Sequence, residues 1–306
     1  MKSPPFLPLL LSTVIAAVAS VANAAEPAAL FGATPLTAKD SFTKGVEGPA
    51  CDAAGNIYAV NFQQQQTIGR VSPTGETEVF VTLPGISVGN GIRFGAGGIM
   101  YVADYTGHNV LRIDAATRKI SVHAHEPAMN QPNDLAVAPN GVLYASDPDW
   151  KNKHGQVWRV DANGKATRVA SDMGTTNGIE VSPDGKSLYV NESVQRNVWA
   201  FDILPDGALS NKRLLRQFTD FGFDGMRCDV DGNLYITRHG KGSVVKMSAQ
   251  GDILREIPVL GANPTNICSG GVDGRTAYVT EAEHRRIVQF RVDRPGLEWE
   301  RQRNAR

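Results

Sequence analysis

The stretch from Asn133 to Tyr144, NDLAVAPNGVLY, decides the fold, because five other segments of the chain repeat its pattern. In each copy a polar residue precedes an apolar strand, and a glycine-containing turn leads into a second strand that carries a tyrosine. The six copies read EGPACDAAGNIY, NGIRFGAGGIMY, NDLAVAPNGVLY, NGIEVSPDGKSLY, DGMRCDVDGNLY and NICSGGVDGRTAY. Their tyrosines are Tyr58, Tyr101, Tyr144, Tyr189, Tyr235 and Tyr278, which stand 43 to 46 residues apart. A spacing this regular is typical of a repeat architecture.

Each repeat predicts about four strands. The first two form a hairpin whose turn is Pro139-Asn140-Gly141 in the third copy, and further apolar runs such as 156–160 follow. No long amphipathic helical pattern appears after the first residues. A repeat of about 45 residues with four strands is typical of a β-propeller blade, whereas an open β-solenoid needs shorter repeats. The sequence therefore predicts an all-β protein with six blades in one domain, residues 25–306, with its core at about 40–292.

The net charge and the composition exclude some classes of function. The chain has 306 residues, with 31 Lys and Arg against 31 Asp and Glu, so its formal net charge is zero. Sequence-independent binding to nucleic acid or anionic membranes depends on a surplus of positive charge, so we expect neither partner. The composition, 42% hydrophobic and 20% charged, is that of a folded protein.

The first 24 residues predict a cleaved signal peptide. Lys2 precedes an apolar stretch from Phe6 to about Ala19, and Ala22-Asn23-Ala24 forms an A-x-A cleavage pattern. A membrane anchor is the alternative, but the run is short and contains Pro8. We therefore expect a periplasmic or secreted protein with no membrane span after cleavage. The three cysteines, Cys51, Cys228 and Cys268, fit neither a zinc site nor a CxxC motif, which favours buried thiols.

The residue that opens each repeat carries a side-chain oxygen. These six residues are Glu47, Asn90, Asn133, Asn177, Asp224 and Asn266. Because the innermost strands of a propeller line its channel, we expect all six to converge at one end of it. Strand alternation would place Asn177 on the same face as Ile179 and Val181, in poorly solvated surroundings. No Lys or Arg occupies these six positions to balance the two acids.

A divalent cation would neutralise the two carboxylates. An all-oxygen donor set favours Ca²⁺, which accepts 6–8 oxygens, with Mn²⁺, Mg²⁺ or Zn²⁺ as alternatives. The competing interpretation is that the amides hydrogen-bond between blades and hold no ion. A second alternative is a binding or scaffold protein with a structural calcium, because a propeller fold does not decide function.

At these residues the chain resembles the family of senescence marker protein 30, gluconolactonases and luciferin-regenerating enzyme. The matching motifs are Glu47-Gly48-Pro49, Pro132-Asn133-Asp134-Leu135, Thr176-Asn177-Gly178-Ile179, Phe223-Asp224-Gly225-Met226 and Asn263-Pro264-Thr265-Asn266. The resemblance implies a six-bladed propeller with one divalent cation, and hydrolysis of lactones, related esters or, in some relatives, organophosphates. It implies Glu47, Asn177 and Asp224 as core ligands and Asn133 as a fourth ligand or substrate contact. The resemblance implies no ligand role for Asn90 and Asn266, which are candidates for residues that contact and support the ligands.

Asp224 is the expected general base or nucleophile, with a purely electrostatic role as the alternative. Sugar-lactone members of the family carry an Arg where this chain has Gln131, so the resemblance implies hydrolysis but not gluconolactone as the preferred substrate. The second strand of each hairpin returns to the ligand end, and its exits are expected to contact substrate. From them we select Asp147, Trp150, Arg238 and His239, together with Gln131.

Overall fold

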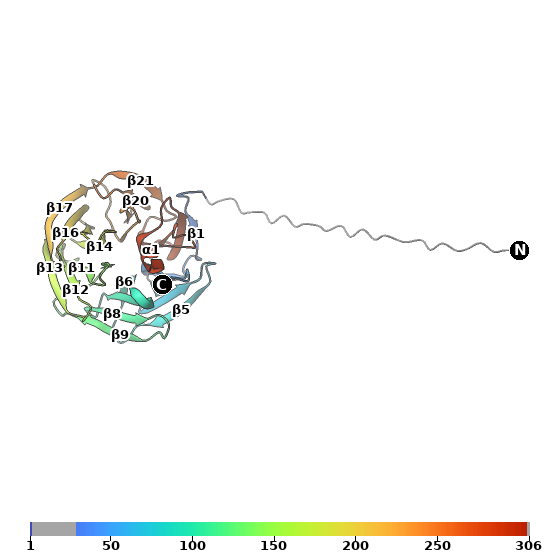
Figure 1. Ribbon diagram of the computed structural model, residues 1–306, viewed down its shortest axis with the longest axis horizontal. Coiled ribbons are helices and arrows are strands. Elements are labelled where there is room, and N and C mark those ends of the chain that lie inside the picture. The colour runs from blue at the N-terminus through green and yellow to red at the C-terminus, as the bar shows by residue number, and fades with distance from the viewer. Residues whose placement is uncertain (2–28, 305–306) are drawn as a thin grey trace.

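The computed structural model describes Met1 and residues 29–304, so the predicted signal peptide lies outside the described residues apart from Met1. Figure 1 shows six sheets arranged in a ring around a central channel. Each sheet has four strands that pair antiparallel in the order of the chain, innermost strand first, except where the ring closes. The prediction of an all-β, six-bladed propeller is confirmed.

The first three blades follow the repeat pattern. Blade 1 consists of β2 (Phe42–Cys51), β3 (Ile57–Phe62), β4 (Thr67–Val71) and β5 (Thr77–Thr82). Blade 2 consists of β6 (Gly89–Phe94), β7 (Ile99–Asp104), β8 (Asn109–Asp114) and β9 (Ile120–His125), with a 3-10 turn at Ala96–Gly98. Blade 3 consists of β10 (Leu135–Val137), β11 (Leu143–Asp149), β12 (His154–Val160) and β13 (Ala166–Met173).

The last three blades complete the ring. Blade 4 consists of β14 (Thr176–Val181), β15 (Ser187–Glu192), β16 (Asn197–Ile203) and β17 (Leu209–Gln217). Blade 5 consists of β18 (Met226–Cys228), β19 (Leu234–Arg238), β20 (Ser243–Met247) and β21 (Ile253–Pro258). Blade 6 consists of β22 (Pro264–Gly270), β23 (Thr276–Glu281), β24 (Arg286–Arg291) and, as its outermost strand, β1 (Thr34–Pro35).

The ring closes through β1, which lies outside the core that the repeats predicted. Thr34 pairs with Gln289 and Pro35 with Val288, so the N-terminal strand completes the last blade before the chain enters β2 of the first. Only two residues of β1 join this ladder. The repeats do not reveal β1 because it stands alone before the first copy.

The core lies between the blades. Each interface between neighbouring blades holds a cluster of buried apolar side chains; Val60, Ile92 and Val102, for example, pack together between blades 1 and 2 and are 0% exposed. Burying such side chains stabilises each interface by about 1.5–3 kcal/mol per residue. The tight hairpin turns that lead out of the channel use glycine where φ is positive, as at Gly141, where φ is 83°.

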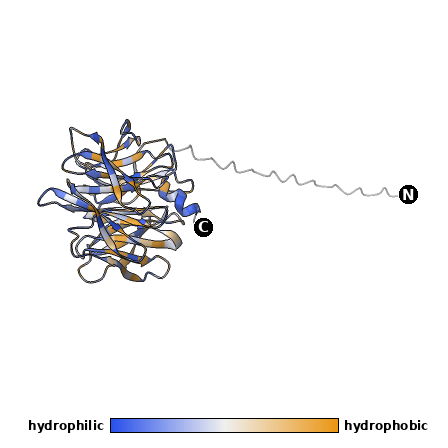
Figure 2. Cartoon of the chain, turned by 60° about the vertical axis from the view of Figure 1, so that its left-hand side comes forward, coloured by the Kyte–Doolittle hydropathy of each residue, from blue (hydrophilic) through white to orange (hydrophobic). Residues whose placement is uncertain are grey.

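A short C-terminal helix, α1 (Leu297–Asn304), packs at the end of the ring where several innermost strands finish. Gln302 donates to the carbonyl of Cys51 at 2.7 Å, and Arg301 donates to the carbonyls of Val137 and Ser182. These carbonyls lie at the C-terminal ends of innermost strands, whereas the six oxygen-bearing residues lie at least four positions earlier, on those strands or just before them. Figure 1 shows α1 near the centre of the ring, and Figure 2 shows it as a hydrophilic helix on one side of the disc. None of the helices among the described residues is long and apolar enough to span a membrane.

Candidate functional site

The six oxygen-bearing residues lie at the channel end opposite α1, which we call the mouth. Irregular strand pairing directs several of them into the channel. The ladder between β2 and β3 shifts register on both sides of Glu47, and the ladder between β14 and β15 shifts between Thr176 and Ile179, around Asn177. A bulge of this kind redirects a side chain toward the other face of the strand. Asn133 and Asp224 come two residues before β10 and β18, just outside regular pairing.

Three of the predicted ligand oxygens are buried without a hydrogen-bond partner among the described residues. They are Glu47 Oε1, Asn133 Oδ1 and Asn177 Oδ1. The three side chains come from blades 1, 3 and 4 and are 6%, 5% and 2% exposed. A buried oxygen without a partner costs about 1–3 kcal/mol, so three of them on predicted ligand residues fit a site that a ligand completes.

The neighbours of Asn177 fix the direction of its amide. Asn177 Nδ2 donates to Ser193 Oγ at 3.0 Å, and Ser193 Oγ donates its one proton to the carbonyl oxygen of Phe223 at 2.7 Å. The hydroxyl of Ser193 is therefore an acceptor toward Asn177, and the amide must present its nitrogen there. Asn177 Oδ1 is consequently the atom left facing the site.

The two carboxyl groups of the site repel each other. Burial, followed by the negative charge of Asp134, raises the pKa of Glu47 to about 7. Burial, followed by the neighbouring Glu47, raises the pKa of the half-buried Asp224 well above its usual range. A cation between them would remove this penalty, because an opposite charge within a few ångströms favours the ionised form. The four oxygen donors therefore fit a divalent ion of the calcium type.

Asn266 and Asn90 have different surroundings. The amide of the wholly buried Asn266 is fully engaged: its Oδ1 accepts from the backbone N–H of Ile267 and from Arg227, and its Nδ2 donates to Glu47 Oε2 at 3.1 Å and to Asp134. Asn266 thus orients Glu47. Asn90 is half-buried and donates to the backbone carbonyl of Asn133 at 3.0 Å, next to a predicted ligand.

Beneath the mouth lies a layer of charged residues that the sequence reasoning missed. Asp134, 0% exposed, pairs with Arg93 at 2.9 Å and with Arg227 at 3.3 Å. Burial raises the pKa of Asp134, although the Arg93 guanidinium opposes the shift. Arg93 and Arg227 each stand three residues after a predicted site residue. Arg93 follows a register shift between Gly89 and Ile92, and Arg227 follows Asp224, which lies before β18 and outside its regular pairing. These irregularities correct the simple alternation that paired the oxygens with apolar side chains.

The same layer reaches the other end of the channel. Glu180, three residues after Asn177, lies 3.9 Å from Arg93, and Glu298 of α1 lies 3.4 Å from Arg227 Nε. Burial raises the pKa of both glutamates to about 7. A continuous chain of polar contacts therefore runs from α1 through Arg227 and Asn266 to Glu47.

Two of the predicted substrate contacts are structural residues. Asp147 is 0% exposed, and its carboxylate accepts the backbone N–H groups of Asn130 and Gln131 and the side-chain donors of Gln156 and Trp158. Arg238 is also 0% exposed; it donates to Asp220 at 2.7 Å. These placements correct the prediction for Asp147 and Arg238, because neither side chain has a free polar surface at the mouth.

The other three predicted contacts lie at the mouth. Gln131 is half-buried, two residues before Asn133, and Trp150 is 37% exposed in the turn after β11. His239 is exposed in the turn after β19, and partial burial lowers the pKa of its imidazole. A further acidic group at this end, Glu281, Glu283 and His284, forms a local turn in which Glu281 accepts the backbone N–H groups of the other two.

Comparison with known proteins matches residues 45–283 to the model of the SMP-30/Gluconolactonase/LRE-like region, which confirms the resemblance drawn from the motifs. The chain is 25% identical over 294 residues to a gluconolactonase of Zymomonas mobilis, covering 85% of this chain and 82% of that protein. It is 31% identical over 169 residues to a 6-deoxy-6-sulfogluconolactonase of Pseudomonas putida, covering 53% of this chain and 58% of that protein. The solved structure of regucalcin from Agrobacterium tumefaciens, titled a calcium-binding protein, shares the fold with a TM-score of 0.76 at 21% identity, covering 87% of this chain and 95% of that one.

Proposed function

The chain belongs to the SMP-30/Gluconolactonase/LRE-like family, and on that premise we propose that it is a divalent-metal-dependent hydrolase of lactones or related esters. The observation that carries the proposal is the set of three buried, unpartnered oxygens from Glu47, Asn133 and Asn177. The carboxyl group of Asp224 neighbours the side chains of Glu47 and Asn177. The relatives named gluconolactonase and 6-deoxy-6-sulfogluconolactonase support the reaction class.

The four donors would hold one cation, for which Ca²⁺ is the best match. Two carboxylates supply two negative charges, and the two amide oxygens add neutral donors of the hard type that Ca²⁺ prefers. When bound, such an ion polarises a carbonyl group and lowers the pKa of a water molecule. With four protein donors against the 6–8 that Ca²⁺ accepts, the site has room for water and substrate.

Asp224 is the residue that we assign to proton transfer. It is half-buried, whereas Glu47 is 6% exposed, so Asp224 offers more surface toward the mouth. Its carboxylate accepts a proton from water as the water oxygen bonds to the lactone carbonyl carbon. The bond from that carbon to the ring oxygen then breaks, and the proton passes to the ring oxygen, which leaves a hydroxy acid.

The side chains at the mouth favour a substrate with few hydroxyl groups. Gln131 presents a neutral amide beside Asn133, and Trp150 presents an aromatic surface that is 37% exposed. An apolar or aryl group packs against such a ring, while a sugar hydroxyl gains only a neutral hydrogen bond from Gln131. We also propose that the protein is exported, on the basis of its first 24 residues.

The test measures initial rates for gluconolactone, aliphatic lactones and an aryl ester, with added Ca²⁺, Mn²⁺, Mg²⁺ or Zn²⁺ and with chelator. Asp224→Asn is expected to lower kcat/KM by about 10²-fold or more. Asp184→Asn, the same change in the turn between β14 and β15, is the matched control and should leave the rate unchanged. If no lactone or ester reacts faster than with Asp224→Asn, the hydrolase proposal is wrong. If chelator leaves the rates unchanged, the metal part is wrong.

A further inference from the structure

Two of the three cysteines meet where the ring closes. Cys51 is the last residue of β2 in blade 1, and Cys268 lies in β22 of blade 6. Their sulfur atoms are 3.1 Å apart, although 217 positions separate the residues in the chain. A disulfide bond is about 2.05 Å long, so the two sulfurs need to approach by only about 1 Å to bond.

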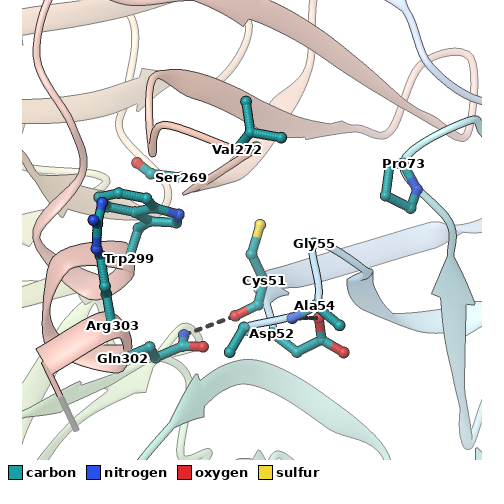
Figure 3. A pocket seen from close by; sticks show the side chains of 12 residues that line it. Cys51, Asp52, Ala54, Gly55, Pro73, Ser269, Val272, Trp299, Gln302 and Arg303 are labelled. Atoms are coloured by element: carbon teal, nitrogen blue, oxygen red, sulfur yellow. Dashed lines mark hydrogen bonds between the residues drawn. The ribbon is translucent and has the colours of Figure 1, made fainter. Parts of the chain in front are cut away.

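The surroundings are shaped for this approach. A Cβ atom added at Gly270 would lie 2.8 Å from Cys51 Sγ, so the glycine leaves room for the sulfur. Cys51 also lines a cavity of about 470 Å³ beside Ser269 and Trp299. Figure 3 shows the Cys51 side chain directed into this cavity, which gives the β2 side of the pair space to move.

The two cysteines lie where the first blade of the ring meets the last. Elsewhere in the ring the outermost strand of each blade has at least five residues, but blade 6 is completed by the two residues of β1. The segment that enters blade 1 is therefore held on blade 6 by the short β1–β24 ladder and by single backbone hydrogen bonds on either side of it, such as that from Leu36 to Ile287. A covalent link between the innermost strands of blades 1 and 6 would close the ring at the inner edge as well.

We propose that Cys51 and Cys268 form a disulfide that joins the first blade to the last. Each thiol loses its proton, the two sulfurs together lose two electrons, and the S–S bond forms. A disulfide oxidant, such as glutathione disulfide or an oxidoreductase disulfide, takes up the two electrons and two protons and becomes two thiols. Because Cys51 and Cys268 are 2% and 0% exposed, the exchange takes place while the chain folds, before the strands pack.

Cys228 provides the internal control. It is buried in blade 5 with the carbonyl oxygen of Val181 at 3.9 Å as its polar contact, whereas the recorded contact between cysteine sulfurs among the described residues joins Cys51 and Cys268. The proposal therefore requires one free thiol per oxidised chain, and it requires that thiol to be Cys228. It is independent of the hydrolase activity, so neither result decides the other.

The test refolds the full chain from denaturant in a buffer of oxidised and reduced glutathione, and then counts thiols and maps linked peptides by mass spectrometry. We expect one thiol per chain before reduction, three after it, and a peptide pair that joins Cys51 to Cys268. The Tm of the oxidised protein should exceed that of the reduced protein by about 5 °C or more. Cys228→Ala should keep this difference, and Cys268→Ala should abolish it.

Three thiols per chain after refolding, or a link that involves Cys228, would overturn the proposal. A linked protein whose Tm does not exceed that of the reduced form would overturn the role in ring closure. These results come from the wild-type chain, so the proposal stays testable even if Cys268→Ala does not fold.

Discussion

Replacing Asp134 by Asn tests whether the buried charge layer supports the mouth of the channel. The Asp134 carboxylate is 0% exposed and lies between Arg93 and Arg227, whose side chains are 4% and 2% exposed. The substitution keeps the shape of the side chain but leaves two buried guanidinium groups short of a counter-charge. Removing one partner from a buried ion pair costs about 3–5 kcal/mol. At about 2 °C per kcal/mol for a chain of this size, Tm should fall by about 6–10 °C.

The same change should weaken metal binding. Asp134 adds negative potential beside Glu47, and without it the two arginines leave an excess of positive charge just below the donors. We expect the affinity for Ca²⁺ to fall by about tenfold or more, because close charges interact strongly in surroundings of low dielectric constant. Differential scanning calorimetry of the chelated protein measures the first effect, and isothermal titration calorimetry measures the second.

Asp202→Asn is the matched control for this experiment. Asp202 pairs with Arg213 at 2.6 Å, but both side chains are at least 40% exposed, so the surrounding water screens the pair. Its loss should leave Tm and Ca²⁺ affinity close to the wild-type values. If Asp134→Asn lowers Tm no more than Asp202→Asn does, the charge layer is not a stabilising unit and the reasoning fails.

Three further predictions follow from the site. Glu47→Gln should lower Ca²⁺ affinity by about 10²-fold in titration calorimetry, whereas Asn90→Ala should lower it less than tenfold; equal losses would refute the donor assignment. Burial raises the pKa of Glu180 to about 7 from 4.5, so the folded protein binds more protons than the unfolded chain between these values. The chelated protein should therefore lose up to about 3 kcal/mol of stability as pH rises from 4.5 to 7, and Glu180→Gln should reduce this slope in denaturant titrations. Gln131→Arg should raise the kcat/KM ratio of gluconolactone to an aliphatic lactone by about ten- to a hundredfold, and an unchanged ratio would contradict the specificity argument.

The sequence predicted the blades and the mouth because both are repeated. A single hairpin with a tyrosine at a fixed position does not predict a fold. Six equally spaced copies predict the ring, and they predict that the opening residues of the repeats lie at the same end of it. The charge layer is not repeated: the positions three residues further on are Arg93, Glu180 and Arg227 in three blades, but Ala50, Ala136 and Ser269 in the others. Register shifts precede Arg93 and Glu180, and Arg227 follows residues that lie outside the regular pairing of β18. These irregularities have no marker in the local sequence, so strict alternation did not predict them.

The errors at Asp147 and Arg238 have a common physical origin. Both stand at the end of a second strand, where a polar side chain either faces solvent or satisfies the backbone of a neighbouring loop. Asp147 accepts the backbone N–H groups of Asn130 and Gln131, more than 15 positions earlier in the chain. The local sequence does not show which loop lies next to such a side chain. It therefore does not distinguish a side chain that faces solvent from one that binds the backbone of a loop. For the same reason, the local sequence does not predict the contact between Cys51 and Cys268, which come from the first and the last blade.

The two ends of the channel carry different groups, which follow one another in layers from the mouth to α1. At the mouth lie the unpartnered oxygens of Glu47, Asn133 and Asn177, and Trp150 is 37% exposed in the turn after β11. One layer below, Asp134 is paired with Arg93 and Arg227, and α1 lies at the opposite end, where it contacts several blades. On the proposed function, a substrate would meet the donors from the side of the mouth, with the paired charges beneath them. The layer thus supports the site from below, because Asn266 connects Asp134 to Glu47 through hydrogen bonds from one amide group, and on the proposed function the other side of the donors is where water and substrate would bind.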